Sequence, residues 1–166
     1  DGLETAAAWT AAVQRQDGPC CLALTRQKLP ALSRPAGFKD EDVLKGAYTV
    51  YDSPSPLNVI IATGSEVAPA IEAAKILTEK GAATRVVSMP CVELFMAQPE
   101  SYRNQVLPQN GRRISVEAGR TGGWREIIGD RGLAIGVDRF GASAPTEVLA
   151  EKFGLTGPQI AAKIQG

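Results

Sequence analysis

The sequence contains no histidine among its 166 residues. Imidazole is the side chain most often used as a general base and a metal ligand near neutral pH. Every mechanism that needs one is therefore excluded from these residues. Cysteine is scarce as well, because there are only three and two of them are the adjacent Cys20 and Cys21. Three cysteines without histidine make neither a disulfide framework nor a structural zinc site, and they predict free thiols in a reducing compartment.

Charge of one sign and long apolar runs are also missing. Lysine plus arginine balances aspartate plus glutamate at 18 each, and no basic run is longer than Arg112-Arg113. We therefore expect no nucleic-acid or membrane partner. No stretch has the roughly 20 apolar residues of a membrane span, and the polar start lacks the pattern of a signal peptide. Because the first residues read like the inside of a domain and lack a methionine, we expect a fragment of a longer protein.

The sequence does contain an apolar run, Cys20–Thr25, that ends at Arg26. A run that is apolar on both faces predicts a central strand of a parallel sheet, with Cys20 and Cys21 buried on opposite faces. Ligands of open parallel sheets bind beyond the carboxyl ends of the strands. A guanidinium at such a place suits phosphate or carboxylate. From position alone, anion binding and a structural ion pair are equally open for Arg26.

The segment before this strand predicts a helix over Glu4–Gln16, with Ala6, Trp9 and Val13 on one face. One helix and one strand cannot cover both sides of the strand, so its sheet must continue outside this chain or in a second domain. Residues 28–45 lack periodicity and predict a linker, in which the acidic cluster 40–42 is solvated or caps a helical turn.

From Gly46 onwards, expected strands and helices alternate, which predicts an α/β fold with a mostly parallel sheet and helices on both faces. The expected strands are 48–52, 58–63, 83–89, 113–116 and 132–137, and the expected helices are 66–80, 99–107, 144–153 and 158–164. Ser143 or Ala144 suits the cap of the third helix, with Pro145 in its first turn. Thr156 and Gln159 have the spacing of a capping box for the last helix.

Three places in this second part are candidate sites. The turn at Gly64 joins a strand to a helix and could hold a phosphate, but a single glycine matches no phosphate-binding fingerprint, and an ordinary capped turn is favoured. Glu117 ends a strand and could act as a base, yet it is isolated, which favours a structural role. Ser143 is excluded as a nucleophile because no histidine can activate it.

The motifs of the chain, taken in order, resemble those of transketolase over nearly its whole length. They are individually weak but specific as an ordered set: Leu24–Pro30, Lys45–Tyr48, Ala62–Val67, Val87–Pro90, Glu93–Phe95, Gln98, Tyr102-Arg103, Val106–Pro108, Val116–Gly119, Asp138–Pro145 and Phe153-Gly154.

The resemblance implies that residues 1–30 are the tail of a pyrimidine-binding domain, 31–45 a linker and 46–166 a three-layer C-terminal domain. It implies a homodimeric parent enzyme of the cytoplasm or plastid stroma, in the pentose phosphate pathway or Calvin cycle. That enzyme moves a two-carbon ketol unit between sugar phosphates with thiamine diphosphate and Mg²⁺ or Ca²⁺. Arg26 matches the arginine that helps bind the substrate phosphate.

The rest of the family's machinery is missing here. There is no metal-binding Gly-Asp-Gly run, and the activating glutamate and the active-site histidines lie upstream in the family. We therefore expect no catalytic, cofactor-binding or metal-binding residue, and a fragment that is inactive alone and serves packing between domains and subunits. Two alternatives stay open. One is an independent module that binds an anion at Gly64 or at Gly122-Gly123, and the other is a different thiamine enzyme with the same C-terminal fold.

Overall fold

A five-stranded sheet forms the centre of the computed structural model, which describes residues 1–166. The strands are β1 (Tyr48–Tyr51), β2 (Asn58–Ala62), β3 (Thr84–Ser88), β4 (Arg112–Val116) and β5 (Leu133–Ile135). Their order across the sheet is β1-β3-β2-β4-β5. The β1 strand is antiparallel to β3, and the other pairs are parallel. This confirms the expected mostly parallel, mixed sheet.

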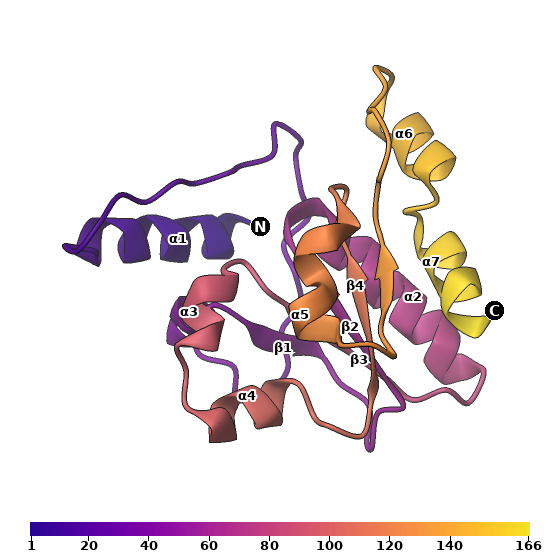
Figure 1. Ribbon diagram of the computed structural model, residues 1–166, viewed down its shortest axis with the longest axis horizontal. Helices are drawn as coiled ribbons and strands as arrows, with labels where there is room; N and C mark the ends of the chain where they lie inside the picture. Colours follow the sequence, from indigo (N-terminus) through magenta and orange to yellow (C-terminus); the bar gives the residue numbers. More distant parts are fainter.

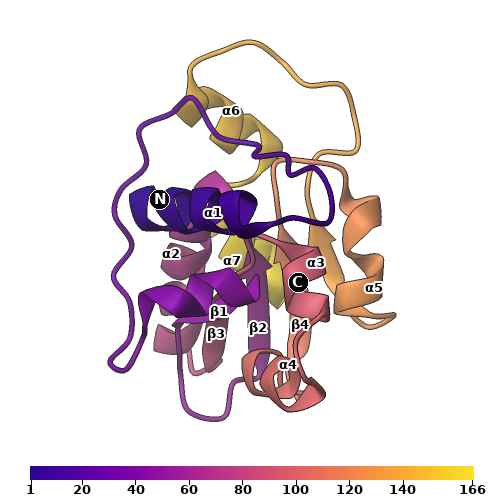
Figure 2. The ribbon, with the colours of Figure 1, turned by 90° about the vertical axis from the view of Figure 1, so that its left-hand side faces the viewer.

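Helices cover both faces of the sheet and make three layers (Figure 2). The helices are α1 (Gly2–Gln14), α2 (Val67–Glu79), α3 (Val92–Met96), α4 (Glu100–Val106), α5 (Arg125–Ile128), α6 (Thr146–Phe153) and α7 (Gly157–Gln165), with 3-10 turns η1 (Asp40–Lys45), η2 (Gly64–Glu66) and η3 (Thr121–Trp124). Figure 1 shows α2 and α7 together on one face and α3, α4 and α5 on the other. None of the helices is long and apolar enough to span a bilayer.

The strand sequences produce this layering because successive side chains of a strand point to opposite faces. Ile60, Val86 and Ile114 lie side by side in register and pack in the core under α2 and α7. Their neighbours Val59 and Ile61 face the second core, with Phe95, Trp124 and Ile127. Both faces of the central strands are therefore buried, as their continuous apolar runs predict.

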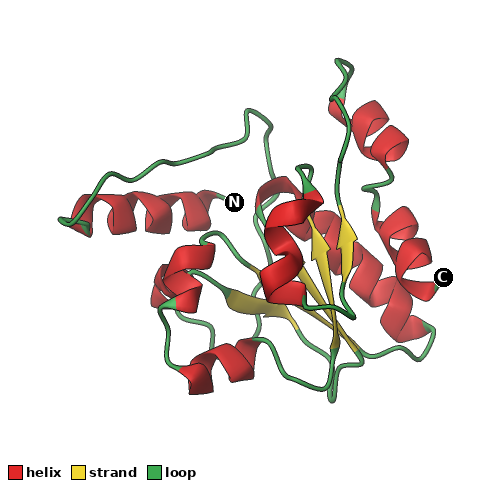
Figure 3. Ribbon diagram, viewed as in Figure 1, coloured by secondary structure: helices red, strands yellow, loops and turns green.

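The expected strand over Cys20–Thr25 does not form, and this prediction was wrong. The segment is extended without ladder bonds, and Cys20 and Cys21 are exposed rather than buried. A strand needs neighbours to pair its N–H and C=O groups, and no strand of this chain adjoins it. Figure 3 shows the whole stretch between α1 and η1 as loop.

The first helix begins two residues earlier than expected. Ala6, Trp9 and Val13 do share one face, and this face is exposed, since Trp9 and Val13 are 56% and 79% accessible. Leu3, Ala7 and the buried Glu4 face the domain instead. Periodicity identifies an apolar stripe but cannot say which neighbour covers it.

The linker contains the helical turn η1, in which Asp42 accepts the Lys39 N–H at 3.0 Å, so the acidic cluster 40–42 does cap a helical turn as one of its two expected roles. Three smaller points differ from the expectations. The short helix α3 was not predicted. Pro145 is the N-cap of α6, so neither Ser143 nor Ala144 caps it. Thr156 caps α7 by position only, because its hydroxyl donates to the Gln159 side chain at 2.9 Å and makes no bond to the backbone.

Gly46 is the tightest point between the linker and the sheet. Its φ is +87°, and a Cβ there would overlap the carbonyl oxygen of Cys91, the N-cap of α3, and the backbone nitrogen of Phe95 within that helix. Gly37 has the same φ, but a Cβ there would meet nothing within 4 Å. Substituting each glycine therefore distinguishes the cost of backbone strain, which both positions share, from the cost of steric overlap, which only Gly46 has.

We predict that Gly37→Ala costs about 1–2 kcal/mol, the strain of a left-handed alanine. Gly46→Ala should cost about 1–3 kcal/mol more, because the methyl group also overlaps backbone that cannot rotate away. Urea denaturation of the two variants measures this difference directly. Equal losses in the two variants would contradict the close approach at Gly46.

Candidate functional site

Arg26 lies in an exposed segment, residues 15–31, that we call the arm. The arm joins the far end of α1 to the linker (Figure 1). Arg26 forms no ion pair and no side-chain hydrogen bond, and it is exposed. The hydrogen bond nearest to it joins the Gln27 N–H to the Thr25 hydroxyl at 3.2 Å. Within this chain, the guanidinium thus keeps all its donors free.

The carboxylate of Asp1 holds together the start of α1 and the residues that follow the arm, a point that we call the root of the arm. Its Oδ1 accepts the Glu4 N–H at 3.1 Å, as the N-cap of α1, and the Arg34 Nη2 at 2.8 Å. Its Oδ2 accepts the Leu32 N–H at 3.0 Å, from 31 residues further along the chain. One carboxylate therefore ties the start of α1 to the end of the arm. The Asp1 side chain is only 3% exposed, which makes these bonds costly to lose.

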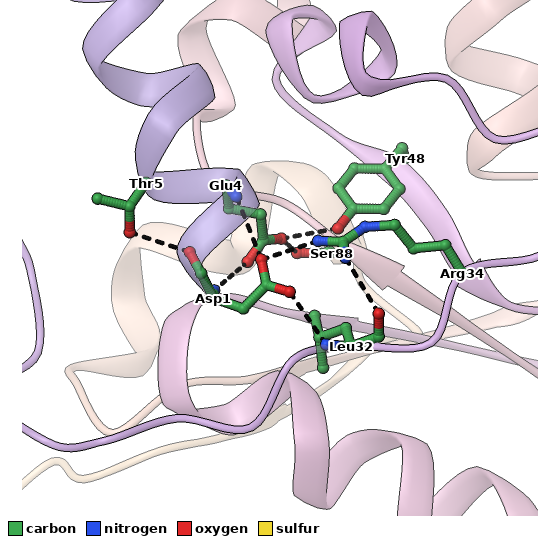
Figure 4. Close-up of polar contacts among 7 residues, drawn as sticks. All are labelled: Asp1, Glu4, Thr5, Leu32, Arg34, Tyr48 and Ser88. Atoms are coloured by element: carbon green, nitrogen blue, oxygen red, sulfur yellow. Dashed lines mark hydrogen bonds and ion pairs between the residues drawn. The ribbon is translucent and has the colours of Figure 1, made fainter.

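Glu4 connects this root to the sheet (Figure 4). Its Oε1 accepts the hydroxyl of Tyr48 on β1 at 2.9 Å and the hydroxyl of Ser88 on β3. Its Oε2 accepts a hydrogen bond from the amino-terminal ammonium of Asp1 at 2.8 Å, which completes a capping box and is also an ion pair in this chain. Burial raises the pKa of Glu4, but the hydrogen bond and positive charge of the Asp1 ammonium, together with the bonds from Ser88 and Tyr48, outweigh it, so the net pKa lies below the ordinary value.

Arg34 completes what we call the polar cluster: Asp1, Glu4, Leu32, Arg34, Tyr48 and Ser88. Its Nη1 donates to the Leu32 carbonyl at 3.0 Å. The guanidinium carbon lies 5.1 Å from the Phe38 ring centre and 5.8 Å from that of Tyr48, which adds cation–π attraction. Burial and the Glu4 charge raise the pKa of Tyr48, so this hydroxyl stays a donor.

The sequence patterns did not predict the polar cluster. Only the spacing of Asp1 and Glu4, which suits a capping box, could have revealed part of it. The partners of Glu4 lie 44 and 84 residues away in the sequence. Such contacts follow from packing and have no local signature.

Ligands of open α/β sheets bind where the chain reverses its order, outside the carboxyl ends of the strands. Here the connections from β2 and β4 lead to opposite sides, so the crevice lies between Gly64 and Ala118. The carboxylate of Glu66 fills it: Oε2 accepts the Ala118 N–H at 3.2 Å, and Oε1 accepts the Ser65 hydroxyl at 2.7 Å. A negative group of the chain thus lies beside the Gly64 turn.

The glycine turn after β4 is occupied in a similar way. Asp138 accepts the Thr121 N–H at 3.0 Å and the Thr121 hydroxyl at 2.7 Å, beside Gly122 and Gly123. These two bonds hold the pKa of Asp138 below its ordinary value. Glu117 accepts the Trp124 indole N–H at 2.7 Å, which supports the structural role favoured for it. Ser143 lies in an exposed loop without a hydrogen bond to its hydroxyl.

The side chains of this chain do not fit a divalent metal. No group of three or more His, Cys, Asp or Glu residues lies close enough together to hold one. The acidic residues at the carboxyl edge each bind backbone or side-chain donors of the chain instead.

Comparison with known protein families first shows which class of domain residues 46–156 form. Residues 46–156 match the family model described as the transketolase-like TK C-terminal domain. This range contains the whole sheet and starts at Gly46, just after the turn η1.

Similarity to whole proteins then identifies the family. A transketolase of Cupriavidus necator is 54% identical over 162 residues, which cover 98% of this chain and 24% of that protein. A transketolase of Aquifex aeolicus is 46% identical and covers 99% of this chain. A mutant transketolase of Pichia stipitis superimposes with a TM-score of 0.91 at 37% identity, covering 99% of this chain and 24% of its own. The chain belongs to the transketolase family, and it spans about a quarter of the length of these relatives.

We predict that acid weakens the polar cluster through Glu4. Because the folded pKa of Glu4 lies below the unfolded one, its bonds stabilise the fold above about pH 4.5 and are lost as the pH falls through the folded value. Glu4→Gln should lower the free energy of unfolding at pH 7 by about 1.5–3 kcal/mol and flatten its decline between pH 5 and 3. Denaturant titrations at several pH values measure both effects.

The matched control is Glu79→Gln at the exposed end of α2. It should leave the pH dependence unchanged. If Glu4→Gln declined with pH as steeply as the unmodified chain, Glu4 would not be the titrating group.

Proposed function

We propose that this chain is the C-terminal quarter of a transketolase that transfers a two-carbon ketol unit between sugar phosphates. In this proposal the chain contributes one substrate contact, Arg26, and is inactive alone. The observation that carries it is the free guanidinium on the arm, in a chain of this family. A planar fork of donors suits a phosphate group, and no carboxylate of the chain competes for it.

A solved relative supports the choice of ligand. A Pichia stipitis transketolase in complex with sedoheptulose 7-phosphate superimposes on this chain with a TM-score of 0.90 at 37% identity. It covers 98% of this chain, including the arm region, and 23% of its own length. A phosphorylated ketose is therefore the class of substrate that we assign to Arg26.

The cofactors belong to the rest of the parent enzyme in this proposal. Thiamine diphosphate and Mg²⁺ or Ca²⁺ find no fitting group of ligands here, since the chain has no histidine and no cluster of metal ligands. We assign residues 1–30 to the end of a pyrimidine-binding domain, 31–45 to the linker and 46–166 to the C-terminal domain. The parent enzyme is then a homodimer of the cytoplasm or plastid stroma, and the C-terminal domain serves packing.

The alternative of an independent anion-binding module is disfavoured by the carboxyl edge of the sheet. Glu66 and Asp138 occupy the two glycine turns at which an anion would bind. A phosphate there would have to displace a carboxylate and then lie beside it, which like charges oppose. Titration with nucleotides and sugar phosphates tests this module, and saturable micromolar binding to the isolated chain would favour it.

We predict that Arg26→Ala in the full-length enzyme raises KM for a ketose phosphate by about 10- to 150-fold. This is the loss of a charge-assisted bond of about 1.5–3 kcal/mol. The same ketose without its phosphate should be turned over as before. Steady-state kinetics with the two donors measure this, and an equal loss with both donors would rule out the phosphate role.

A second exposed arginine provides the control for charge. Arg131 lies at the opposite, amino edge of the sheet, just before β5, and makes no ion pair. Arg131→Ala removes the same charge and should leave both KM values unchanged. A change as large as that of Arg26→Ala would indicate a general electrostatic effect.

We also predict that this chain alone does not bind thiamine diphosphate with Mg²⁺. Isothermal titration of the isolated chain should give no saturable heat, because the ligands of the metal and diphosphate are not among its residues. Tight binding would overturn the assignment of the cofactor to the rest of the parent enzyme.

A further inference from the structure

A depression of about 780 Å³ lies at the amino edge of the sheet, where β2, β4 and β5 begin. It is large enough for a small metabolite, since ligand pockets typically measure about 300–1,000 Å³. All of its lining residues lie between Leu57 and Arg131, within the domain of residues 46–156. In Figure 1 the amino ends of these strands point to the bottom of the view, whereas α1 and the arm lie at the upper left. Residues 1–45 therefore take no part in this depression.

The lining of the depression carries an excess of positive charge. It contains the three arginines Arg112, Arg113 and Arg131, and its one acidic residue is Asp130. None of these four side chains forms an ion pair within the chain. Cations that share a depression repel one another, and an anion between them removes this repulsion. The depression therefore favours an anionic ligand.

Two of the arginines are held in place by carbonyl groups, which leave their charge uncompensated. Arg112 donates its Nη1 to the Ile164 carbonyl at 3.0 Å. Arg113 donates its Nη1 to the Ile127 carbonyl at 2.9 Å and its Nη2 to the Leu107 carbonyl at 3.1 Å. Burial lowers the pKa of Arg113, because its guanidinium is partly removed from water. A fixed and partly desolvated cation attracts an anion more strongly than a solvated one.

The positive charges stand on both sides of the sheet. Successive residues of a strand point to opposite faces. Arg112 accordingly reaches the Ile164 carbonyl of α7, and Arg113 reaches the Ile127 carbonyl of α5. Arg131 adds a third charge just before β5, the strand that pairs with β4. A ligand with two anionic groups can therefore meet more of this charge than a ligand with one.

The loop before β4 adds backbone donors to the arginines. The N–H groups of Asn110 and Gly111 make no hydrogen bond to the backbone of the chain. Gly111 lies so close to β2 that a Cβ there would be 2.7 Å from the Val59 Cγ2. Guanidinium and backbone N–H groups together suit phosphate oxygens. Only Leu57 and Ile128 of the lining are apolar, which favours a compact, hydrated anion over one with an aromatic body.

We propose that the depression at the amino edge of the sheet binds a compact molecule that carries two phosphate groups. Arg112 and Arg131 bind the phosphate groups, and Arg113 contributes its charge from the other face of the sheet. The N–H groups of the loop before β4 complete the site. This inference goes beyond the proposed function and does not depend on Arg26.

The experiment titrates the full-length enzyme, loaded with thiamine diphosphate and Mg²⁺, with propane-1,3-diol bisphosphate in a calorimeter. This probe has two phosphate groups and no carbonyl group that could react with the cofactor. The loaded cofactor keeps the probe out of the place of its own diphosphate. We expect saturable binding with a Kd below about 1 mM at 0.15 M salt. The absence of saturable binding, including through cover of this edge by the rest of the enzyme, would overturn the proposal.

Arg131→Ala and Asp130→Asn are the decisive variants, because neither side chain makes an ion pair and both residues are exposed. Arg131→Ala should raise the Kd about 5- to 10-fold, between the effects of an exposed ion pair and of a charge-assisted hydrogen bond. Asp130→Asn removes the one acidic group of the lining and should lower the Kd about 2- to 5-fold. An unchanged Kd in Arg131→Ala would show that the probe binds elsewhere.

A matched variant and a matched anion test the specificity of the site. Arg125 is exposed at the start of α5, makes no ion pair and lies outside the lining. Arg125→Ala should leave the Kd unchanged, and a rise equal to that of Arg131→Ala would overturn the proposal. Tricarballylate carries three carboxylates and no phosphate, and it should bind at least about 10-fold more weakly. Equal binding of the two anions would refute the phosphate class of the ligand.

Arg26→Ala separates this site from the proposed function. It should leave the Kd of the bisphosphate unchanged while it raises KM for a ketose phosphate. If the bisphosphate lost its binding in Arg26→Ala and kept it in Arg131→Ala, the inference would be wrong and the proposed function would stand. If Arg26→Ala left KM unchanged and Arg131→Ala raised the Kd, the proposed function would fail and this site would stand.

Discussion

The buried carboxylate of Glu4 is the interaction on which the arrangement of the chain depends. It accepts bonds from the amino-terminal ammonium of Asp1, the N-cap of α1, and from hydroxyl groups on β1 and β3. Without those donors a charge in this place would be strongly unfavourable, and without the charge the donors would be left unpaired. The Glu4 carboxylate and its donors therefore stabilise the fold only together. The result is a fixed joint between α1 and a sheet that begins more than 40 residues later.

The sheet has the topology at which open α/β folds bind ligands, and carboxylates of the chain itself lie at that edge. The crevice at the reversal of strand order is closed by Glu66, and the next turn is closed by Asp138. The backbone N–H groups of Ala118 and Thr121 at this edge therefore bind carboxylates of the same chain. Arg26 lies away from this edge in sequence, on the exposed arm.

Much of the fold follows from local patterns. The strands over residues 58–62, 84–88 and 112–116 are short apolar runs bounded by turns, and the helix after Gly64 has the expected periodicity. The segment Cys20–Thr25 carries the same strand pattern and forms no strand. Apolar composition reports the environment a segment is suited to, and pairing requires neighbours that this chain does not supply.

The sequence by itself determined the alternation of strands and helices, the mostly parallel sheet and, through its ordered motifs, the family. Each of these depends on residues close together in the chain. Only the tertiary structure decided which face of α1 is buried, what fills the glycine turns, and that Asp1, Glu4, Tyr48 and Ser88 meet. These contacts join residues up to 84 positions apart, and their bonds exist only once the sheet has brought its strands into register.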